Sequence, residues 1–144
     1  MKLKLKIFLF ALLTMVFVIG SAYSCEPDIK NGYKLAKKKC GTCHDLTDKQ
    51  KKKLGPPLWD IVGRDFASYP GYKYSKAFKK VKVIMGEDQD SRWTNEMLEA
   101  FIDDPKEMIP KTRMSFSGIN SERDRIDIVE FLNTLKTKVE LTTN

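Results

Sequence analysis

Cys40-Gly41-Thr42-Cys43-His44 is the most informative run of residues in this 144-residue chain. Two cysteines separated by two residues, with a histidine directly after the second, form a C-x-x-C-H pattern that is typical of c-type haem attachment. Each thiol can add across one vinyl group of the porphyrin, and the short spacer keeps both sulfurs on one side of a tight turn. The histidine is then carried beneath the iron as its proximal ligand. The motif therefore predicts one haem c, covalently attached through Cys40 and Cys43.

A bare C-x-x-C pair also occurs in zinc sites and in thioredoxin-like redox centres. A zinc site would have to recruit Cys25, because His44 is the only histidine and the sequence has no second pair of ligands. A redox pair of the thioredoxin kind normally lies in a βαβ unit, and the sequence shows no such pattern. The haem hypothesis is favoured, and both alternatives stay open at this point.

The single histidine also limits the second axial position of the iron. A haem with two histidine ligands is excluded because there is no second imidazole. Methionine is the best remaining candidate for a second protein ligand, since a His/Met pair suits an electron carrier. The chain has six methionines, so composition alone does not identify the ligand.

The composition indicates one small, basic domain. Hydrophobic residues make up 42% of the chain, but part of them lies in an N-terminal apolar run that a globular domain would not bury. A covalently held haem would add apolar surface to the remaining core. Lysine and arginine together number 26, against 19 acidic residues, which gives a net charge of +7.

Part of this positive charge flanks the C-x-x-C-H motif, with lysines at 37–39, 49 and 51–53. These lysines are either ordinary solvated surface or a positive collar around an exposed haem edge, which would steer an acidic partner. No nucleic-acid-binding motif accompanies the charge, so we expect no nucleic-acid partner.

Residues 1–24 have the features of an export segment. Three lysines within residues 2–6 form a basic start, and residues 7–19 form an apolar run of the length found in signal peptides. Small residues precede Cys25 at the positions that signal cleavage requires. Cleavage would leave residues 25–144 as the haem domain.

Two other fates of this segment are open. As a helix, residues 7–23 would be about 25 Å long at about 1.5 Å per residue, which is marginal for a hydrocarbon core of about 30 Å, so an uncleaved membrane anchor is a second hypothesis. Lipidation of Cys25 is a third, although Tyr23 suits it badly. All three place the domain outside the cytoplasm. We expect it on the periplasmic side of the bacterial inner membrane, where thioether attachment takes place, soluble or anchored.

Hydrophobic periodicity predicts an all-α fold. A first helix is expected over residues 28–39, with Asp28 as its cap and Gly32 on its apolar face. Glycine weakens a helix, and a close helix–helix contact would explain its presence there. The last helix is expected to start at Ser121, where Ser-x-x-Asp resembles a capping box and apolar residues recur at i, i+3, i+4 and i+7.

The middle of the chain is more broken. Pro56 and Pro57 stop any helix and leave carbonyl groups in a stiff segment, where one of them could accept the second ring N–H of an iron-bound histidine. Short helices are expected at residues 75–81 and 95–103. Loops are expected at residues 85–91 and 106–120.

Seven short motifs follow one another along residues 28–136. They are C-G-T-C-H at 40–44, G-P-P-L at 55–58, G-R at 63–64, P-G-Y-K-Y-S at 70–75, W-T at 93–94, D-P-K at 104–106 and P-K-T-R-M-S-F-S-G at 110–118. In this order they resemble the motifs of class I c-type cytochromes, the family of mitochondrial cytochrome c and bacterial cytochrome c2. The set is far more specific than C-x-x-C-H alone.

The resemblance implies a role for each matching residue. Met114 matches the family's distal iron ligand, with Met108 in the same loop as the serious competitor. Pro56 matches the residue whose carbonyl accepts a hydrogen bond from the proximal histidine. Gly32 and Phe131 match the close contact between the first and last helices. The residues that match the surroundings of the haem propionates are Arg64, Tyr74, Trp93 and Thr112.

Three features depart from the family pattern. Lys111 stands where the family often has glycine, and Asp60 stands where it usually has a smaller residue. The loop between Tyr74 and Trp93 is longer than in the mitochondrial proteins. These departures concern loop geometry and the docking surface rather than the haem ligands.

The resemblance implies a monomeric, single-haem electron carrier, not an enzyme, that passes electrons from a bc1-type complex to a terminal oxidase. A buried haem with two protein ligands offers no open site for a substrate. Two rival functions remain. A five-coordinate haem enzyme or gas sensor requires Met114 to be unbound, and a membrane-tethered haem subunit of an oxidase complex would be favoured by an uncleaved segment at residues 7–23.

Overall fold

The computed structural model describes residues 26–86 and 91–136. Its helices are α2 (Ile29–Lys39), α3 (Lys76–Gly86), α4 (Asn95–Asp103), α5 (Pro105–Met108) and α6 (Glu122–Thr134). Apart from an isolated bridge between Asp65 and Arg92, the described residues form no β-structure. None of the described helices is long and apolar enough to cross a membrane. The export segment predicted at residues 1–24 lies outside the described residues.

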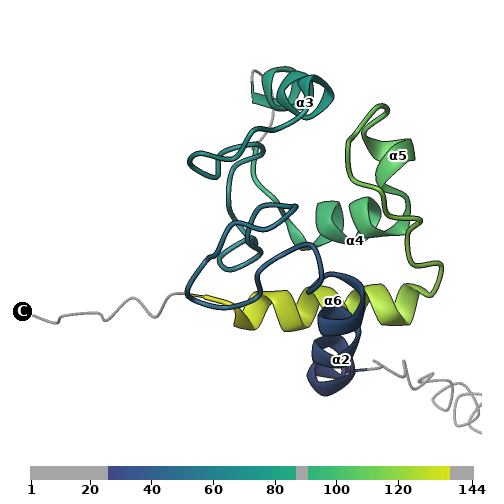
Figure 1. The fold of residues 1–144 in the computed structure, drawn as a ribbon. Helices are drawn as coiled ribbons and strands as arrows, with labels where there is room; N and C mark the ends of the chain where they lie inside the picture. The colour runs from purple at the N-terminus through teal and green to yellow at the C-terminus, as the bar shows by residue number, and fades with distance from the viewer. Residues whose placement is uncertain (1–25, 87–90, 137–144) are drawn as a thin grey trace, which may run out of the picture.

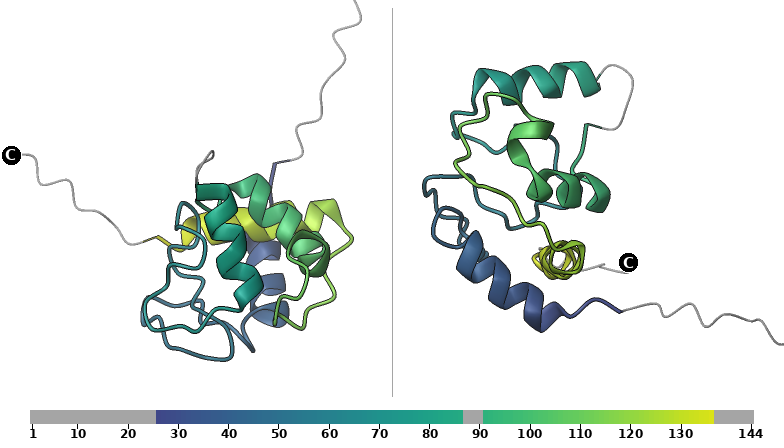
Figure 2. Two further views of the ribbon diagram at one scale, coloured as in Figure 1. Left: turned by 90° about the horizontal axis from the view of Figure 1, so that it is seen from above. Right: turned by 90° about the vertical axis from the view of Figure 1, so that its right-hand side faces the viewer.

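The helices form two groups joined by long loops. Figure 1 shows α2 and α6 on one side of the molecule and α3 and α5 on the other, with α4 between them. The side view in Figure 2 has the same order, and α4 packs against both α5 and α6. The all-α fold predicted from the sequence is confirmed.

The predicted starts of three helices are confirmed by their caps. The Asp28 carboxylate accepts hydrogen bonds from the first backbone N–H groups of α2. Thr94 accepts from Met97 N at the start of α4, and Ser121 accepts from Asp124 N at the start of α6. In each case a short oxygen-bearing side chain satisfies a donor that the helix itself leaves free.

Two predicted boundaries were wrong. Helix α3 continues to Gly86, although residues 85–91 were expected to be a loop, because residues 76–85 contain neither glycine nor proline to stop it. The segment expected to be irregular at residues 106–120 begins inside helix α5. Asp104 caps this short helix by accepting from Lys106 N and Glu107 N, and Pro105 occupies its first position, where the missing N–H costs nothing.

Among the described helices, α2 and α6 have the most extensive contact, and they cross at Gly32. A Cβ atom added to Gly32 would lie 1.9 Å from the Asp127 carbonyl oxygen and 3.0 Å from Phe131 Cβ. The ring of Tyr33 meets Phe131 edge-on at 5.4 Å between centroids. The predicted contact between Gly32 and Phe131 is therefore present, and the backbone of α6 approaches the glycine more closely still.

A buried carboxylate that was not predicted from the sequence stabilises the same crossing. Asp127 is 1% exposed. It accepts hydrogen bonds from Asp28 N at 2.8 Å and from Asn31 Nδ2 at 2.8 Å, and it pairs with Arg123 Nε at 3.1 Å. One charge of α6 thus holds the first turn of α2 in place, since a buried carboxylate requires such partners.

Aromatic side chains fill the centre of the molecule. Trp93 is 5% exposed and lies 4.1 Å from the ring of Phe66 and 5.1 Å from that of Phe101, between centroids. Phe78 of α3 reaches the ring of Phe101 at 5.7 Å. This cluster joins α3 and α4 to the loop that carries Phe66.

Replacing Gly32 with valine should destabilise the folded protein. Overpacking usually costs about 1–3 kcal/mol, and a clash with backbone should put the cost at the upper end, while the helix propensity gained on losing glycine offsets less than about 1 kcal/mol. Denaturant unfolding of the haem-loaded protein would measure the loss. Lys34→Val, on the exposed face of α2, is the matched control, and equal stabilities of the two variants would contradict the contact.

Candidate haem site

The C-x-x-C-H segment forms a tight turn directly after α2. Cys40 is the C-cap of the helix, and Cys43 N and His44 N both donate to the Cys40 carbonyl, at 3.0 and 2.9 Å. Gly41 fits against α2, because a Cβ atom there would lie 2.6 Å from the Lys37 carbonyl oxygen. Both cysteines are half-buried and neither is in a disulfide. The turn thus presents two free thiols and an imidazole within five residues.

The His44 ring is held by the segment that contains Pro56. His44 Nδ1 lies 2.6 Å from the Pro56 carbonyl oxygen. A carbonyl only accepts, so Nδ1 carries the proton and the lone pair of Nε2 is left for a metal. A Cβ atom on Gly55 would lie 2.3–2.8 Å from three atoms of the ring. Glycine is required there because the backbone packs directly on the imidazole.

The pKa shifts of His44 and Cys40 favour metal binding by the turn over redox chemistry of its thiols. Burial lowers the pKa of His44, against the hydrogen bond to Pro56, which raises it, and this favours the neutral imidazole that a metal needs. Burial and the neighbouring Cys43 raise the pKa of Cys40 to about 11. Reactive redox cysteines have lowered pKa values, so the thioredoxin-like alternative loses support. Among the described residues, no three His, Cys, Asp or Glu side chains gather as a metal site.

Asp45, which was not predicted from the sequence, organises the loop that follows the turn. Its carboxylate is buried and accepts hydrogen bonds from Thr47 N at 3.1 Å, Thr47 Oγ1 at 2.9 Å and Lys51 N at 2.6 Å. Burial acts to raise the pKa of this carboxyl, but the hydrogen bonds outweigh it and hold the pKa below its usual value. The Asp45 carbonyl accepts from Leu58 N at 2.8 Å. The residue therefore links the turn to the proline segment.

Lys53 closes this loop on the turn. Its Nζ donates to the Gly41 carbonyl at 2.6 Å and to the His44 carbonyl at 3.2 Å. From the sequence, Lys53 was predicted to belong to the positive collar. Its ammonium group instead satisfies two carbonyls of the attachment turn, so it is less free to meet a partner than a lysine without such contacts.

Arg64 and Trp93, both matched to the propionate surroundings, lie together in the structure. Trp93 N donates to the Arg64 carbonyl at 2.9 Å, which joins two segments far apart in the sequence. The Arg64 guanidinium donates to the carbonyls of Pro57 at 2.7 Å and Trp59 at 3.2 Å. It therefore braces the segment that holds His44.

Of Tyr74 and Thr112, from the same set, only Tyr74 lines a cavity. The Tyr74 hydroxyl accepts from Tyr69 N at 3.2 Å. Thr112 Oγ1 accepts from Met114 N at 3.3 Å, so it shapes the loop that carries the methionine. Met114 is half-buried against the core, and so is Met108 at the end of α5.

Both residues noted as departures from the family pattern have left-handed backbone conformations. Lys111 has φ +66° and Asp60 has φ +55°. Glycine adopts this region without steric cost, whereas other residues pay about 1–2 kcal/mol. The glycine that the resemblance implies at the position of Lys111 would adopt this conformation without that cost.

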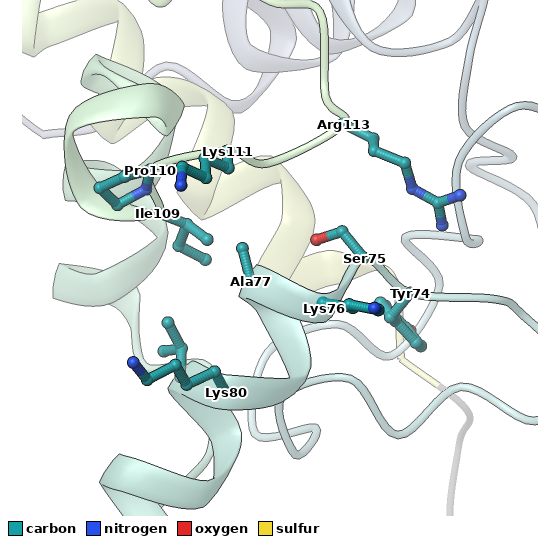
Figure 3. Close-up of a pocket in the computed structure, with 10 residues that line it drawn as sticks. Tyr74, Ser75, Lys76, Ala77, Lys80, Ile109, Pro110, Lys111 and Arg113 are labelled. Carbon is teal, nitrogen blue, oxygen red and sulfur yellow. The ribbon is translucent and has the colours of Figure 1, made fainter.

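The cavity has a volume of about 800 Å³ and lies between α3 and the loop 109–113 (Figure 3). That is within the range of about 300–1,000 Å³ common for cofactor and ligand sites. Ala77, Val81 and Ile109 contribute apolar wall, and none of the lining residues is acidic. Its basic lining residues are Lys76, Lys80, Lys111 and Arg113. His44 and Met114 are not part of its lining, so the cavity reaches only one edge of the site.

The chain matches the cytochrome c family model over residues 29–136. It is 36% identical to a cytochrome c from Euglena viridis over 109 residues, covering 98% of that protein and 76% of this chain. The chain belongs to the cytochrome c family. A cytochrome c from Stellaria longipes is 36% identical over 107 residues, 92% of its length and 74% of this chain.

A cytochrome c homologue from Rickettsia felis is 41% identical over 104 residues, which is 72% of this chain but only 54% of that protein. This chain thus spans about half the length of that relative. Members of the family are haem electron carriers rather than enzymes, and they carry one covalently attached haem c. The free thiols of Cys40 and Cys43 and the neutral imidazole beside them fit that group.

Replacing Asp45 with alanine should lower the free energy of unfolding of the haem-loaded protein by about 1–3 kcal/mol near neutral pH, because three donors lose a charged acceptor. The pKa of Asp45 is lowered on folding, below its usual value of 3.8. Its contribution is therefore fully present above that value and is lost as the pH falls through the folded-state pKa. Denaturant unfolding at a series of pH values would measure both effects.

The stability difference between this variant and the wild type should shrink in acid. Asp48→Ala, at an exposed position of the same loop, is the matched control and should change stability little at any pH. A difference that stays constant well below pH 3.8 would show that the carboxylate charge is not what stabilises the loop.

Proposed function

We propose that this chain is an exported, monomeric, single-haem electron carrier of a respiratory chain, with His44 and Met114 as the axial ligands of its iron. It would take electrons from a bc1-type complex and deliver them to a terminal oxidase. The observation that carries the proposal is the 2.6 Å contact between His44 Nδ1 and the Pro56 carbonyl. It leaves Nε2 of a half-buried, neutral imidazole free beside two free thiols.

The haem iron and its two proposed protein ligands have separate roles. The haem supplies an iron that cycles between Fe(II) and Fe(III), which is the chemistry of an electron carrier. His44 would bind through Nε2, while Pro56 fixes the tautomer and the ring orientation. Met114 would supply its thioether sulfur from a loop whose shape Thr112 helps to hold. Two protein ligands would leave no open position, which favours electron transfer over substrate chemistry.

Four polar or aromatic residues are assigned to the haem propionates. The Arg64 guanidinium lies against the segment that holds His44, where it donates to the Pro57 and Trp59 carbonyls, and this places its charge beside the site. Trp93 is joined to Arg64 by a backbone hydrogen bond. Tyr74 lines the cavity, which has no acidic lining residue. Thr112, beside Met114, completes the set.

Residues 1–24 would direct the protein across the inner membrane, either as a cleaved signal peptide or as a retained anchor, and residues 25–144 would be the cytochrome domain. The basic start and apolar run of the first segment support export. We propose the periplasmic side of the bacterial inner membrane as its location.

We define the docking surface from the basic residues at positions 37–39, 51–53, 73, 76, 111 and 113, keeping those that are exposed and donate to no carbonyl among the described residues. Lys53 is excluded because it donates to the Gly41 and His44 carbonyls, and Arg113 is excluded because it donates to the Lys73 carbonyl. The exposed lysines that remain are Lys37, Lys38, Lys39, Lys51, Lys52, Lys73, Lys76 and Lys111. Complementary charge of this kind mainly accelerates association with an acidic partner.

Met114→Ala should abolish the absorption band of the sulfur–iron bond at the red edge of the oxidised spectrum. It should also lower the reduction potential, while the haem stays covalently attached. The reason is that the thioether ligand is lost but both thioether links to the porphyrin remain. Met108→Ala is the matched control, since that residue is also half-buried. If Met108→Ala removes the band and Met114→Ala does not, the ligand is Met108.

Electron transfer to a terminal oxidase or from a bc1-type complex should slow steeply as salt is raised, because charges are screened over about 8 Å at physiological ionic strength. Reversing the charge at Lys76 or Lys111 should flatten this salt dependence. Lys136, exposed just after the end of α6, is the control position and should matter less. Rates that do not respond to salt would mean that the lysines are ordinary solvated surface.

A further inference from the structure

Asn31 and Gly32, in the first turns of α2, form an asparagine–glycine pair. None of the other asparagines, at positions 95, 120, 133 and 144, precedes a glycine in the sequence. Asparagine followed by glycine is the dipeptide most prone to deamidation in a flexible chain, because glycine has no side chain to hinder its backbone nitrogen and adopts many backbone conformations. The pair is therefore a candidate site of spontaneous modification.

The reaction needs neither an enzyme nor a cofactor. The backbone nitrogen of Gly32 attacks Cγ of Asn31, forms a new C–N bond and loses its proton. The side-chain amide nitrogen of Asn31 leaves as ammonia with that proton, and a succinimide ring remains. Water then opens the ring at either carbonyl, which yields aspartate or isoaspartate. No group is oxidised or reduced, and water is the only co-reactant.

Contacts at the crossing of α2 and α6 oppose this attack in the folded protein. Gly32 N donates to the Asp28 carbonyl at 2.9 Å, so the attacking nitrogen is engaged within the helix. The Asn31 amide is held by Asp127, with Nδ2 2.8 Å from Oδ2. Gly32 is buried and packs on the Asp127 carbonyl, which leaves its backbone no room to close a ring with the side chain. The reaction therefore requires the crossing to open.

Deamidation would place a carboxylate where the Asn31 amide now donates. The new oxygen would face Asp127, which is 1% exposed, and Asp124 Oδ1, which lies 3.5 Å from the amide nitrogen. Asp127 would lose a donor and meet a like charge at a buried position, which is costly. Isoaspartate would also lengthen the backbone of the helical turn that Asp28 caps. Either product would therefore weaken the crossing.

We propose that Asn31-Gly32 is a deamidation site that the folded crossing of α2 and α6 protects, and that its conversion opposes the re-formation of this crossing. The site lies in the half of α2 remote from the attachment turn, and the inference does not depend on the proposed function. A chain kept unfolded, whether before haem attachment or after denaturation, would gradually lose its ability to fold. The modification would thus record the time that the chain has spent unfolded.

The test incubates the haem-loaded protein in mildly alkaline buffer, with and without guanidinium chloride, and measures aspartate and isoaspartate by peptide mass spectrometry. Asn120, which is exposed and precedes Ser121 outside any helix, is the internal comparator. In denaturant, Asn31 should react faster than Asn120. In native buffer the order should reverse. Asn31 should then react at least about a hundredfold more slowly than in denaturant, because it must wait for the crossing to open.

The effect on folding is measured after the incubation in denaturant. The converted fraction, separated by ion exchange, should refold poorly or unfold at lower denaturant concentration than the unmodified fraction. Asn31→Gln keeps an amide donor but forms the larger ring slowly, so it should refold to the same extent before and after the incubation. Asn31→Asp should lower the folding equilibrium constant at least about tenfold, whereas Asn120→Asp should leave it nearly unchanged.

Two results would overturn the inference. One is an equal rate of conversion at Asn31 in native buffer and in denaturant, which would mean that the crossing gives no protection. The other is a converted fraction that refolds and resists denaturant as well as the unmodified protein, which would mean that the crossing accepts the new carboxylate. The second result can be read even if Asn31→Asp does not fold, because it is measured on the wild-type sequence.

Discussion

The hydrogen bond from His44 Nδ1 to the Pro56 carbonyl is the interaction on which the site depends. It sets the tautomer, it orients the ring, and it requires the chain to return to the attachment turn 12 residues after leaving it. Asp45 and Lys53 make that return stable, one through the loop backbone and the other through the carbonyls of the turn. The charged groups of Asp45 and Lys53 thus help to keep the His44 ring in a fixed orientation.

The turn also needs a firm base, which the crossing of α2 and α6 supplies. Gly32 permits the two backbones to approach, and Asp127 fastens the first turn of α2 to α6. Since the attachment turn continues directly from α2, any shift of this helix would move both cysteines. The packing of α2 against α6 therefore determines where the attachment turn lies at the other end of α2 (Figure 1).

Much of this could be read from the sequence, because its signals are local. Caps such as Asp28 and Ser121 lie next to the helices they start, and Gly32 was conspicuous on an apolar face. Asp45 and Asp127 could not be found this way, because a buried carboxylate looks like any surface acid until its donors are known. Likewise, only the fold distinguishes Lys53, which binds carbonyls, from its exposed neighbours. The positive φ of Lys111 shows that this position favours glycine, which the sequence alone could not tell.

The iron is expected between Nε2 of His44 and the sulfur of Met114, and proton NMR of the reduced, haem-loaded protein addresses this most directly. With isotope-labelled methionines assigned individually, the methyl group of a methionine bound over the porphyrin is shifted strongly upfield by the ring current. The Met114 methyl resonance should show this shift, and that of Met108 should stay close to its ordinary position. An unshifted Met114 resonance, with the haem attached and the protein folded, would contradict the proposed coordination.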